Sequence, residues 1–169
     1  MSAIRILPYD PLNQQGVIDT ILPIQQIEFK VPVTLADQPD LLDIPAFYQS
    51  GNGNFWVALA DGCGTGEVVG TIALRDFGNG QGALRKMFVK APYRGPQYSV
   101  AAQLLDALQD WSGQRGIREI YLGTVPALRA AHRFYEKNGF TLIEAAQLPS
   151  TFPRMAVDTV FYLKHLAGA

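Results

Sequence analysis

The sequence predicts one α/β domain, residues 1–169, built around a mixed sheet. Three observations lead to this fold class. With 169 residues, of which 48% are hydrophobic, the chain is long enough to bury a core. Residues 55–89 hold three apolar runs rich in β-branched or aromatic residues and separated by Gly, Asn and Asp, as in an antiparallel meander. From residue 97 onwards helical and strand patterns alternate, as in a βαβα unit.

The residues before the meander predict a strand, a helix and a loop. Residues 3–10 (AIRILPYD) alternate like a short strand, and residues 10–29 repeat apolar side chains at helical intervals. These helical positions are Val17, Ile21, Ile24 and Ile27. Residues 30–54 mix prolines, acids and a short apolar patch, which indicates a loop with one helix.

The residues after the meander predict two helices and three strands. One helical stripe covers residues 97–112 and consists of Ala101, Leu104, Leu105, Leu108 and Trp111. Residues 117–124 form a strand, Pro126 opens a helix that runs to residue 138, and Gly139 ends it in a left-handed conformation. Two last strands are expected at residues 140–144 and 158–166, joined by the proline-containing segment 145–157.

Charge and composition exclude several classes of function. The chain carries 14 Lys and Arg against 15 Asp and Glu, so no basic field attracts nucleic acid or an anionic membrane. Its one cysteine, Cys63, leaves no disulfide framework and no Cys and His cluster for a metal. No run approaches the ~18 apolar residues of a membrane span. We expect a cytoplasmic protein without a metal, nucleic-acid or membrane partner.

A candidate anion site lies where a loop turns into the helix of residues 97–112. Residues 93–105 read YRGPQYSVAAQLL. The first N–H groups of a helix lack intrahelical partners, and the helix dipole favours an anion there. Arg94 adds a forked, permanently charged donor. An ordinary helix start with a solvated arginine shows the same pattern, so the loop alone does not decide the function.

Two motifs together resemble the GNAT superfamily of N-acetyltransferases. Residues 87–108 (MFVKAPYRGPQYSVAAQLLDAL) are similar to its pattern V-x-P-x-x-R-G-x-G-x-G/A, with the proline offset by one and with Gln97 and Ser99 in place of the two later glycines. Residues 130–140 (AAHRFYEKNGF) are similar to A-x-x-F-Y-E-K-x-G-F. The segment 148–163 is like the end of many bacterial members, and the element order of residues 3–165 agrees with that fold.

The resemblance implies a fold and a cofactor. The fold is a mostly antiparallel sheet of about seven strands, flanked by about four helices and splayed between the fourth and fifth strands. The cofactor is acetyl-CoA, released as CoA. Its pantetheine arm would pair with the main chain of Met87, Phe88 and Val89 as an added strand does. Its pyrophosphate would lie on the loop residues Arg94, Gly95, Pro96, Gln97, Tyr98 and Ser99.

Some positions of the cofactor site depart from the family pattern. Gln97 and Ser99 still supply the amide donors that glycines would supply, provided that the backbone does not need a conformation that glycine alone adopts cheaply. Pro96 removes one N–H group. Leu128 stands where the family often has Asn or Gln in contact with the cofactor.

The resemblance gives Tyr135 the catalytic role. A phenol within reach of the sulfur can protonate the thiolate that leaves during direct acetyl transfer to an amine. The base that deprotonates the amine is harder to assign, because the strand of residues 82–89 offers Ala83, Arg85 and Lys86 but no acid. Glu28 and Asp43 are the candidates from elsewhere.

The acceptor is expected to be a primary amine of a small molecule or peptide, entering between residues 28–43 and residues 145–157. The first segment carries Glu28, Asp37, Asp40 and Asp43 against only Lys30, which favours a cationic acceptor unless these acids are simply solvated. The second offers Phe152, Pro153 and Met155 to cover the alkyl part of a substrate.

Two readings of other classes stay open beside the enzyme. The chain could be an acyl-CoA-binding sensor or non-catalytic module with a degenerate pyrophosphate loop, or an interaction protein whose cleft is empty. Fold alone does not separate them. The sequence leaves the acceptor and the oligomeric state open, including a homodimer.

Overall fold

The structure is a computed structural model that describes residues 3–61 and 66–166, so Cys63 lies outside the described residues. Seven strands form one sheet in the order β1-β2-β3-β4-β5-β7-β6, and every neighbouring pair except β4 and β5 is antiparallel. The strands are β1 Ile4–Pro8, β2 Asn54–Ala60, β3 Glu67–Gly78, β4 Gln81–Val89, β5 Glu119–Thr124, β6 Thr141–Ile143 and β7 Val160–His165. The predicted fold class is thereby confirmed.

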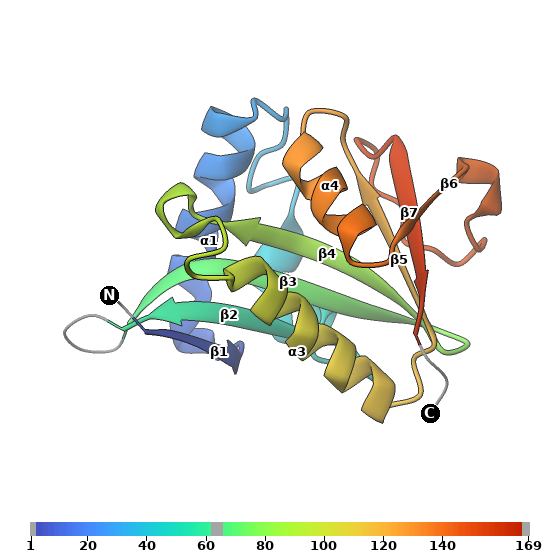
Figure 1. Ribbon diagram of the computed structural model, residues 1–169, viewed down its shortest axis with the longest axis horizontal. Coiled ribbons are helices and arrows are strands. Elements are labelled where there is room, and N and C mark those ends of the chain that lie inside the picture. The colour runs from blue at the N-terminus through green and yellow to red at the C-terminus, as the bar shows by residue number, and fades with distance from the viewer. Residues whose placement is uncertain (1–2, 62–65, 167–169) are drawn as a thin grey trace.

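Four α-helices accompany the sheet in the described part of the chain (Figure 1). They are α1 Gln14–Pro23, α2 Ile44–Phe47, α3 Val100–Gln114 and α4 Arg129–Lys137. A π-helical turn, Ile24–Glu28, continues α1, and 3-10 turns form at Pro11–Asn13, Pro39–Leu42, Ala91–Tyr93 and Ala145–Gln147. No helix in these described ranges combines the length and the apolar character needed to cross a bilayer.

The faces of the sheet pack against different helices. Along β2, Phe55 and Val57 point into a cluster with Val17 and Ile21 of α1, while Trp56 points into a second cluster with α3. Alternation of side chains along a strand produces this division, and because both faces are covered, all of β2 is buried. The site described below lies at the end of the sheet where this coverage stops.

Two helix predictions need correction. Ile27 was expected on the buried stripe of the first helix but is 75% exposed, because the π-helical turn Ile24–Glu28 has a wider period and rotates the later residues away from the core. The helix expected to open at Pro126 begins at Arg129 instead. The N–H group of Leu128 bonds to the carbonyl of Val125, so the intervening residues form a turn. Gly139 ends α4 with a left-handed φ of 90°, as predicted.

The central strands part along their length. The parallel pairing of β4 and β5 joins only Gln81–Ala83 to Glu119–Tyr121. Beyond these residues the strands diverge, which confirms the predicted splay (Figure 1). The register of β4 against β3 also shifts between Thr71 and Ala73, opposite Lys86, whose φ is 54°. One end of the sheet therefore opens between two strands whose main chains are not paired with each other there.

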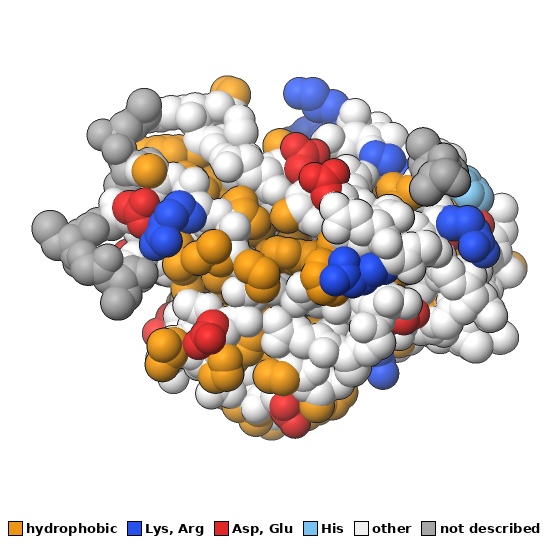
Figure 2. Space-filling view, turned by 90° about the horizontal axis from the view of Figure 1, so that it is seen from below, with side chains coloured by type: hydrophobic (Ala, Val, Ile, Leu, Met, Phe, Trp, Pro, Cys, Tyr) orange, Lys and Arg blue, Asp and Glu red, His pale blue; other side chains and the backbone are white. Residues whose placement is uncertain are grey.

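One face of the molecule mixes charges of both signs (Figure 2). On the face shown in Figure 2, apolar side chains gather near the middle and charged side chains of both signs are scattered around them. This agrees with a formal net charge of −1.

Candidate active site

A pocket of about 220 Å³, here called the central pocket, lies between the end of β4 and the start of α4. Met87, Phe88 and Val89 of β4 form one wall, so the three predicted pantetheine contacts lie together here. Facing them are apolar residues at and after the turn before α4: Leu128, Ala130, Ala131 and Phe134. The pocket is thus an apolar slot along the edge of β4 that is no longer paired with β5.

A second cavity of about 410 Å³, the loop pocket, continues from the central pocket and shares Val89, Arg94, Ala101 and Phe134 with it. Predicted loop residues in its wall are Arg94, Gly95, Pro96 and Ser99. The first turn of α3 also lines it through Val100, Ala101 and Ala102, so N–H groups at the start of a fifteen-residue helix lie at this cavity. Lys137 adds a second cation. The cavity is suited to a polyanion.

Gln97 and Tyr98 line neither the central pocket nor the loop pocket. The Tyr98 ring packs on that of Tyr93, with 5.2 Å between the centroids, and its carbonyl accepts a hydrogen bond from Gln103. The loop therefore divides into residues that face the cavity and residues that hold its shape.

Ser99 shows what the missing glycine would have supplied. Its φ is 51°, in the left-handed region that side chains other than glycine rarely occupy, whereas Gln97 has no positive φ. The N–H group of Ser99 donates to the carbonyl of Gly95, and its hydroxyl donates to the carbonyl of Pro96. The backbone turn before α3 is therefore made without glycine at this position, at some conformational cost.

Arg94 is held in place by neighbours in this structure. Its two terminal nitrogens donate to the Glu28 carboxylate at 2.5 and 2.7 Å, and its Nε donates to the carbonyl of Val89 at 2.8 Å. These bonds from Arg94 hold the pKa of Glu28 below its usual value. Glu28 is therefore a partner of Arg94, and a carboxylate with a lowered pKa is a poor general base.

Tyr135 lies under the central pocket rather than in its wall. It is 5% exposed, and its ring packs against Phe134, Phe140 and Tyr162 at centroid distances of 5.6 to 6.1 Å. Burial raises the pKa of Tyr135, and the charge of Asp158 raises it further. The phenol therefore stays protonated at neutral pH.

A third cavity of about 110 Å³, the inner pocket, adjoins the central pocket through Phe88 and Leu128, which line both. Most of its wall is apolar and comes from Val31 and Val33, the end of β5, and Phe152, Pro153, Met155 and Val157. The two segments expected to frame the acceptor do therefore meet here. Its polar side chains are Gln25, Gln38, Arg85, Lys86, Thr124 and Asp158.

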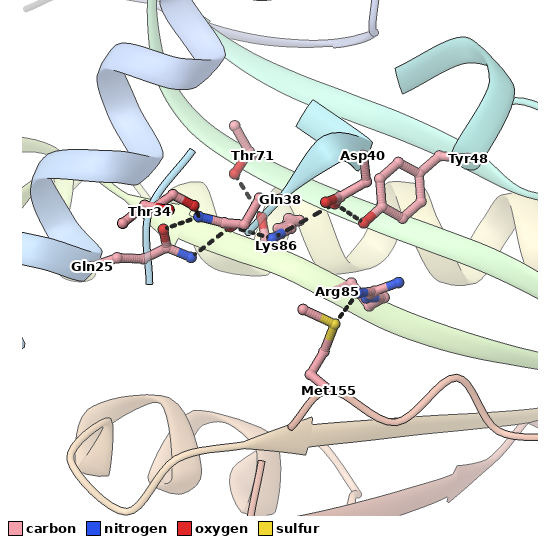
Figure 3. A network of polar contacts seen from close by, with 9 residues as sticks. All are labelled: Gln25, Thr34, Gln38, Asp40, Tyr48, Thr71, Arg85, Lys86 and Met155. Carbon is pink, nitrogen blue, oxygen red and sulfur yellow. Dashed lines mark hydrogen bonds and ion pairs between the residues drawn. The ribbon is translucent and has the colours of Figure 1, made fainter. Parts of the chain in front are cut away.

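Part of this polar set is a closed network (Figure 3). The buried Lys86 ammonium lies 3.6 Å from the Asp40 carboxylate and donates to Gln38, while the Tyr48 hydroxyl also donates to Asp40. The amides of Gln25 and Gln38 bond reciprocally at 2.9 and 3.0 Å. Burial lowers the pKa of Lys86, and Asp40 opposes that effect. These groups satisfy one another and form a rigid wall.

Each of the four acids of the expected rim has a structural partner, but only Glu28 and Asp40 are paired with a cation. Glu28 binds Arg94, and Asp40 is buried with Lys86. Asp37 accepts from the N–H and hydroxyl groups of Thr34, and Asp43 caps α2 by accepting from the N–H of Ala46. Asp43 lines none of the three pockets, so neither expected base faces the inner pocket.

The carboxylate that does face the inner pocket is Asp158, which the sequence reasoning missed. It is 9% exposed, and burial raises its pKa against the opposing charge of Arg85. It lies so close to β5 that a Cβ atom on Gly123 would approach its Oδ2 to 2.5 Å. Its place directly before the last strand was visible in the sequence, but no pattern separated it from other loop acids.

The family is shown by comparison with known proteins. The model of the Acetyltransferase (GNAT) family matches residues 18–140. The chain belongs to this family.

Individual relatives agree with the family assignment. The crystal structure of a GNAT-family acetyltransferase from Staphylococcus aureus Mu50 is 38% identical, with a TM-score of 0.91 over 98% of this chain and 100% of that one. The "probable N-acetyltransferase camello" of Xenopus tropicalis is 33% identical over 129 residues, which are 75% of this chain and 56% of that protein. The chain spans about half the length of the curated relatives it matches.

A more distant structure was solved with a ligand. The PaiA N-acetyltransferase of Thermoplasma acidophilum, crystallised in complex with coenzyme A, has a TM-score of 0.75 at 15% identity and covers 96% of this chain and 99% of that one. At this identity the likeness concerns the fold alone.

Proposed function

We propose that the chain is an acetyl-CoA-dependent N-acetyltransferase whose acceptor is a primary amine of a small molecule or peptide. The observation that carries this proposal is the continuous run of three pockets. A cavity at a helix N-terminus, an apolar slot beside the edge of β4 that is not paired with β5, and a small charged cavity follow one another, with Phe88 and Leu128 at the last junction. An anionic end, a long arm and a reacting group would fit such a run in this order.

The residues present fit acetyl-CoA. The first turn of α3, Arg94 and Lys137 would hold its phosphates. The main chain of Met87–Val89 would pair with the pantetheine arm, and Leu128 would offer apolar contact where the family often has an amide. When bound, the cofactor supplies the acetyl group as a thioester. Because the turn before α3 forms with Ser99 in a left-handed conformation, the loss of the glycine does not prevent the loop from forming, which weakens the reading of a degenerate loop.

Two side chains would manage the protons. Asp158, with its raised pKa, would take the proton from the acceptor ammonium group and so expose the nitrogen lone pair. Tyr135 would donate its hydroxyl proton to the departing sulfur, and the second proton lost by the nitrogen would restore the phenol. A C–N bond forms, a C–S bond breaks, and one proton is released in total.

The test is acetyl transfer to a panel of amines, followed by release of free thiol and by the mass of the product. Tyr135→Phe should lower kcat while leaving CoA affinity nearly unchanged, because the ring packing survives and only the proton donor is lost. Tyr9→Phe is a matched control, since Tyr9 is equally buried but belongs to the cluster on the opposite face of the sheet. Wild-type turnover in Tyr135→Phe would remove Tyr135 from the mechanism.

A further inference from the structure

Arg85 differs from Lys86, the other cation that lines the inner pocket, because no carboxylate of the described residues pairs with it. The hydrogen-bond acceptor of its guanidinium in this structure is the sulfur of Met155, which is a weak acceptor (Figure 3). One face of the group lies over the Tyr48 ring, 5.8 Å from its centroid. Among the described residues, no Asp or Glu oxygen lies within the 4.0 Å of an ion pair to Arg85.

A half-buried guanidinium without a carboxylate partner is well suited to bind an external anion. Arginine presents five N–H donors in a planar fork that matches a carboxylate, and hydrogen bonds between charged groups are the stronger ones. The Met155 side chain is flexible, so a stronger acceptor can displace its sulfur from Arg85 at low cost. Lys86, the residue that follows Arg85, is already paired with Asp40 and Gln38 and is not a competing site for an anion.

Asp158 supplies the opposite charge across the same cavity. Arg85 belongs to β4, whereas Asp158 lies against Gly123 of β5, so the two groups stand on the two sides of the parted strands. They influence each other electrostatically, yet in the part of the chain that the structure describes neither has an ion-pair partner within 4.0 Å. The cavity between them therefore presents one cation and one anion to whatever enters.

The size of the cavity limits what can enter. Its volume is about 110 Å³, well below the roughly 300–1,000 Å³ of pockets that hold drug-sized ligands. A molecule of that size with a carboxylate at one side and an ammonium group at the other is an amino acid. We infer that the acceptor is a free amino acid, whose carboxylate binds Arg85 and whose ammonium group binds Asp158. This inference rests on the proposed function and names the substrate class of the same site.

The experiment compares free amino acids with their carboxamides, which keep the amine and replace only the anionic group. In the wild type, kcat/KM should be higher for the acids by about 10- to 100-fold, the worth of a charged hydrogen-bonded contact. Arg85→Met should abolish this preference by lowering kcat/KM for the acids alone. Arg85→Lys should retain part of it, because the charge remains while the fork is lost. Asp158→Asn should lower kcat/KM for acids and carboxamides alike.

The matched control is Arg75→Met, since Arg75 is on β3 over the Phe47 ring and outside the inner pocket. It should leave the preference unchanged. The KM for acetyl-CoA and the melting temperature of each variant show that the cofactor site and the fold survive. A wild-type preference for carboxamides, or a preference for acids that Arg85→Met leaves intact, overturns the inference.

The two proposals fail in different ways. Transfer to amines without a carboxylate, and not to amino acids, overturns the inference but keeps the enzyme. If no amine is acetylated, the proposed function is wrong, and the inference is then tested by binding alone. Amino acids should still raise the melting temperature of the CoA-saturated protein more than their carboxamides do. Equal shifts would contradict the inference.

Discussion

Ser99 carries the most strained backbone of the cofactor loop, with a φ of 51° immediately before α3. A left-handed residue with a side chain costs roughly 1–2 kcal/mol relative to glycine. The strain persists because two hydrogen bonds to the preceding loop, from the Ser99 N–H to Gly95 and from its hydroxyl to Pro96, fix the turn. The left-handed conformation of Ser99 therefore lowers the free energy of unfolding, but it gives the chain a defined turn into α3.

Substitution at Ser99 tests this account. Ser99→Gly and Ser99→Ala both lose the hydroxyl, but only glycine relieves the left-handed strain, so the glycine variant should be more stable by roughly 1 kcal/mol. Urea unfolding of the two variants measures the difference. Equal unfolding midpoints would mean that the loop relaxes to another conformation when the hydroxyl is absent.

At this scale, residues that stand in a motif could be nominated from the sequence, whereas isolated charges could not. Arg94 and Tyr135 could be named because each stands in a motif with neighbours that fix its place. Asp158 could not, since its role depends on a close approach to Gly123, which is far away in the sequence. Arg85 was visible on the correct strand, but its missing ion-pair partner is a property of the folded molecule alone.

At the scale of elements, the ion pair of Glu28 and Arg94 joins the end of the π-helical turn to the loop before α3. A bound phosphate would meet the same guanidinium. The carboxylate therefore either shares Arg94 with the cofactor or competes for it, and in both cases its negative charge opposes that of the phosphates.

Neutralising Glu28 should strengthen cofactor binding. Glu28→Gln is expected to lower the KM for acetyl-CoA about two- to fivefold, since an exposed ion pair is worth about 0.2–1 kcal/mol.

Arg94→Ala should raise this KM with less effect on kcat, because phosphate contacts are far from the reacting carbon.

The control for these variants is Glu67→Gln. It breaks another exposed pair, with 3.3 Å between Glu67 and Lys90, at residues that line none of the three pockets. It should leave the KM unchanged. A raised KM in Glu28→Gln would show that Glu28 positions Arg94 for the cofactor instead of opposing it.

Elements whose apolar residues follow one regular period were predictable from the sequence, whereas local irregularities such as a π-helical turn or a β-bulge were not. The meander and α3 follow simple patterns and appear nearly as expected. The π-helical turn inserts a different period inside a helical pattern, which is why Ile27 faces solvent. The bulge at Lys86 likewise depends on the partner strand and leaves no mark in the sequence of β4.

At the scale of the whole molecule, cofactor binding should stabilise the fold. The site combines β4, α3 and α4 and exists only when the two parts of the sheet are together, so a ligand at 100 times its Kd adds about 2.7 kcal/mol. For a chain of this size that corresponds to a rise in Tm of roughly 5–10 °C. Thermal unfolding with CoA measures it, and pantetheine, which lacks the phosphates, should give a smaller shift. No shift at millimolar CoA would contradict the site.

The short pairing between β4 and β5 also has a consequence for how the chain folds. Strands β1 to β4 each pair with a neighbour in sequence and, with α1 and α3, are complete by residue 114. Such local pairings form early, and a nascent chain emerges from its N-terminus, so we expect this part to fold while β5, β6 and β7 are still being synthesised. The remaining strands need only three residue pairs of parallel sheet to join it. The gap proposed to receive the ligands is therefore also the boundary at which the later part of the chain docks onto the earlier part.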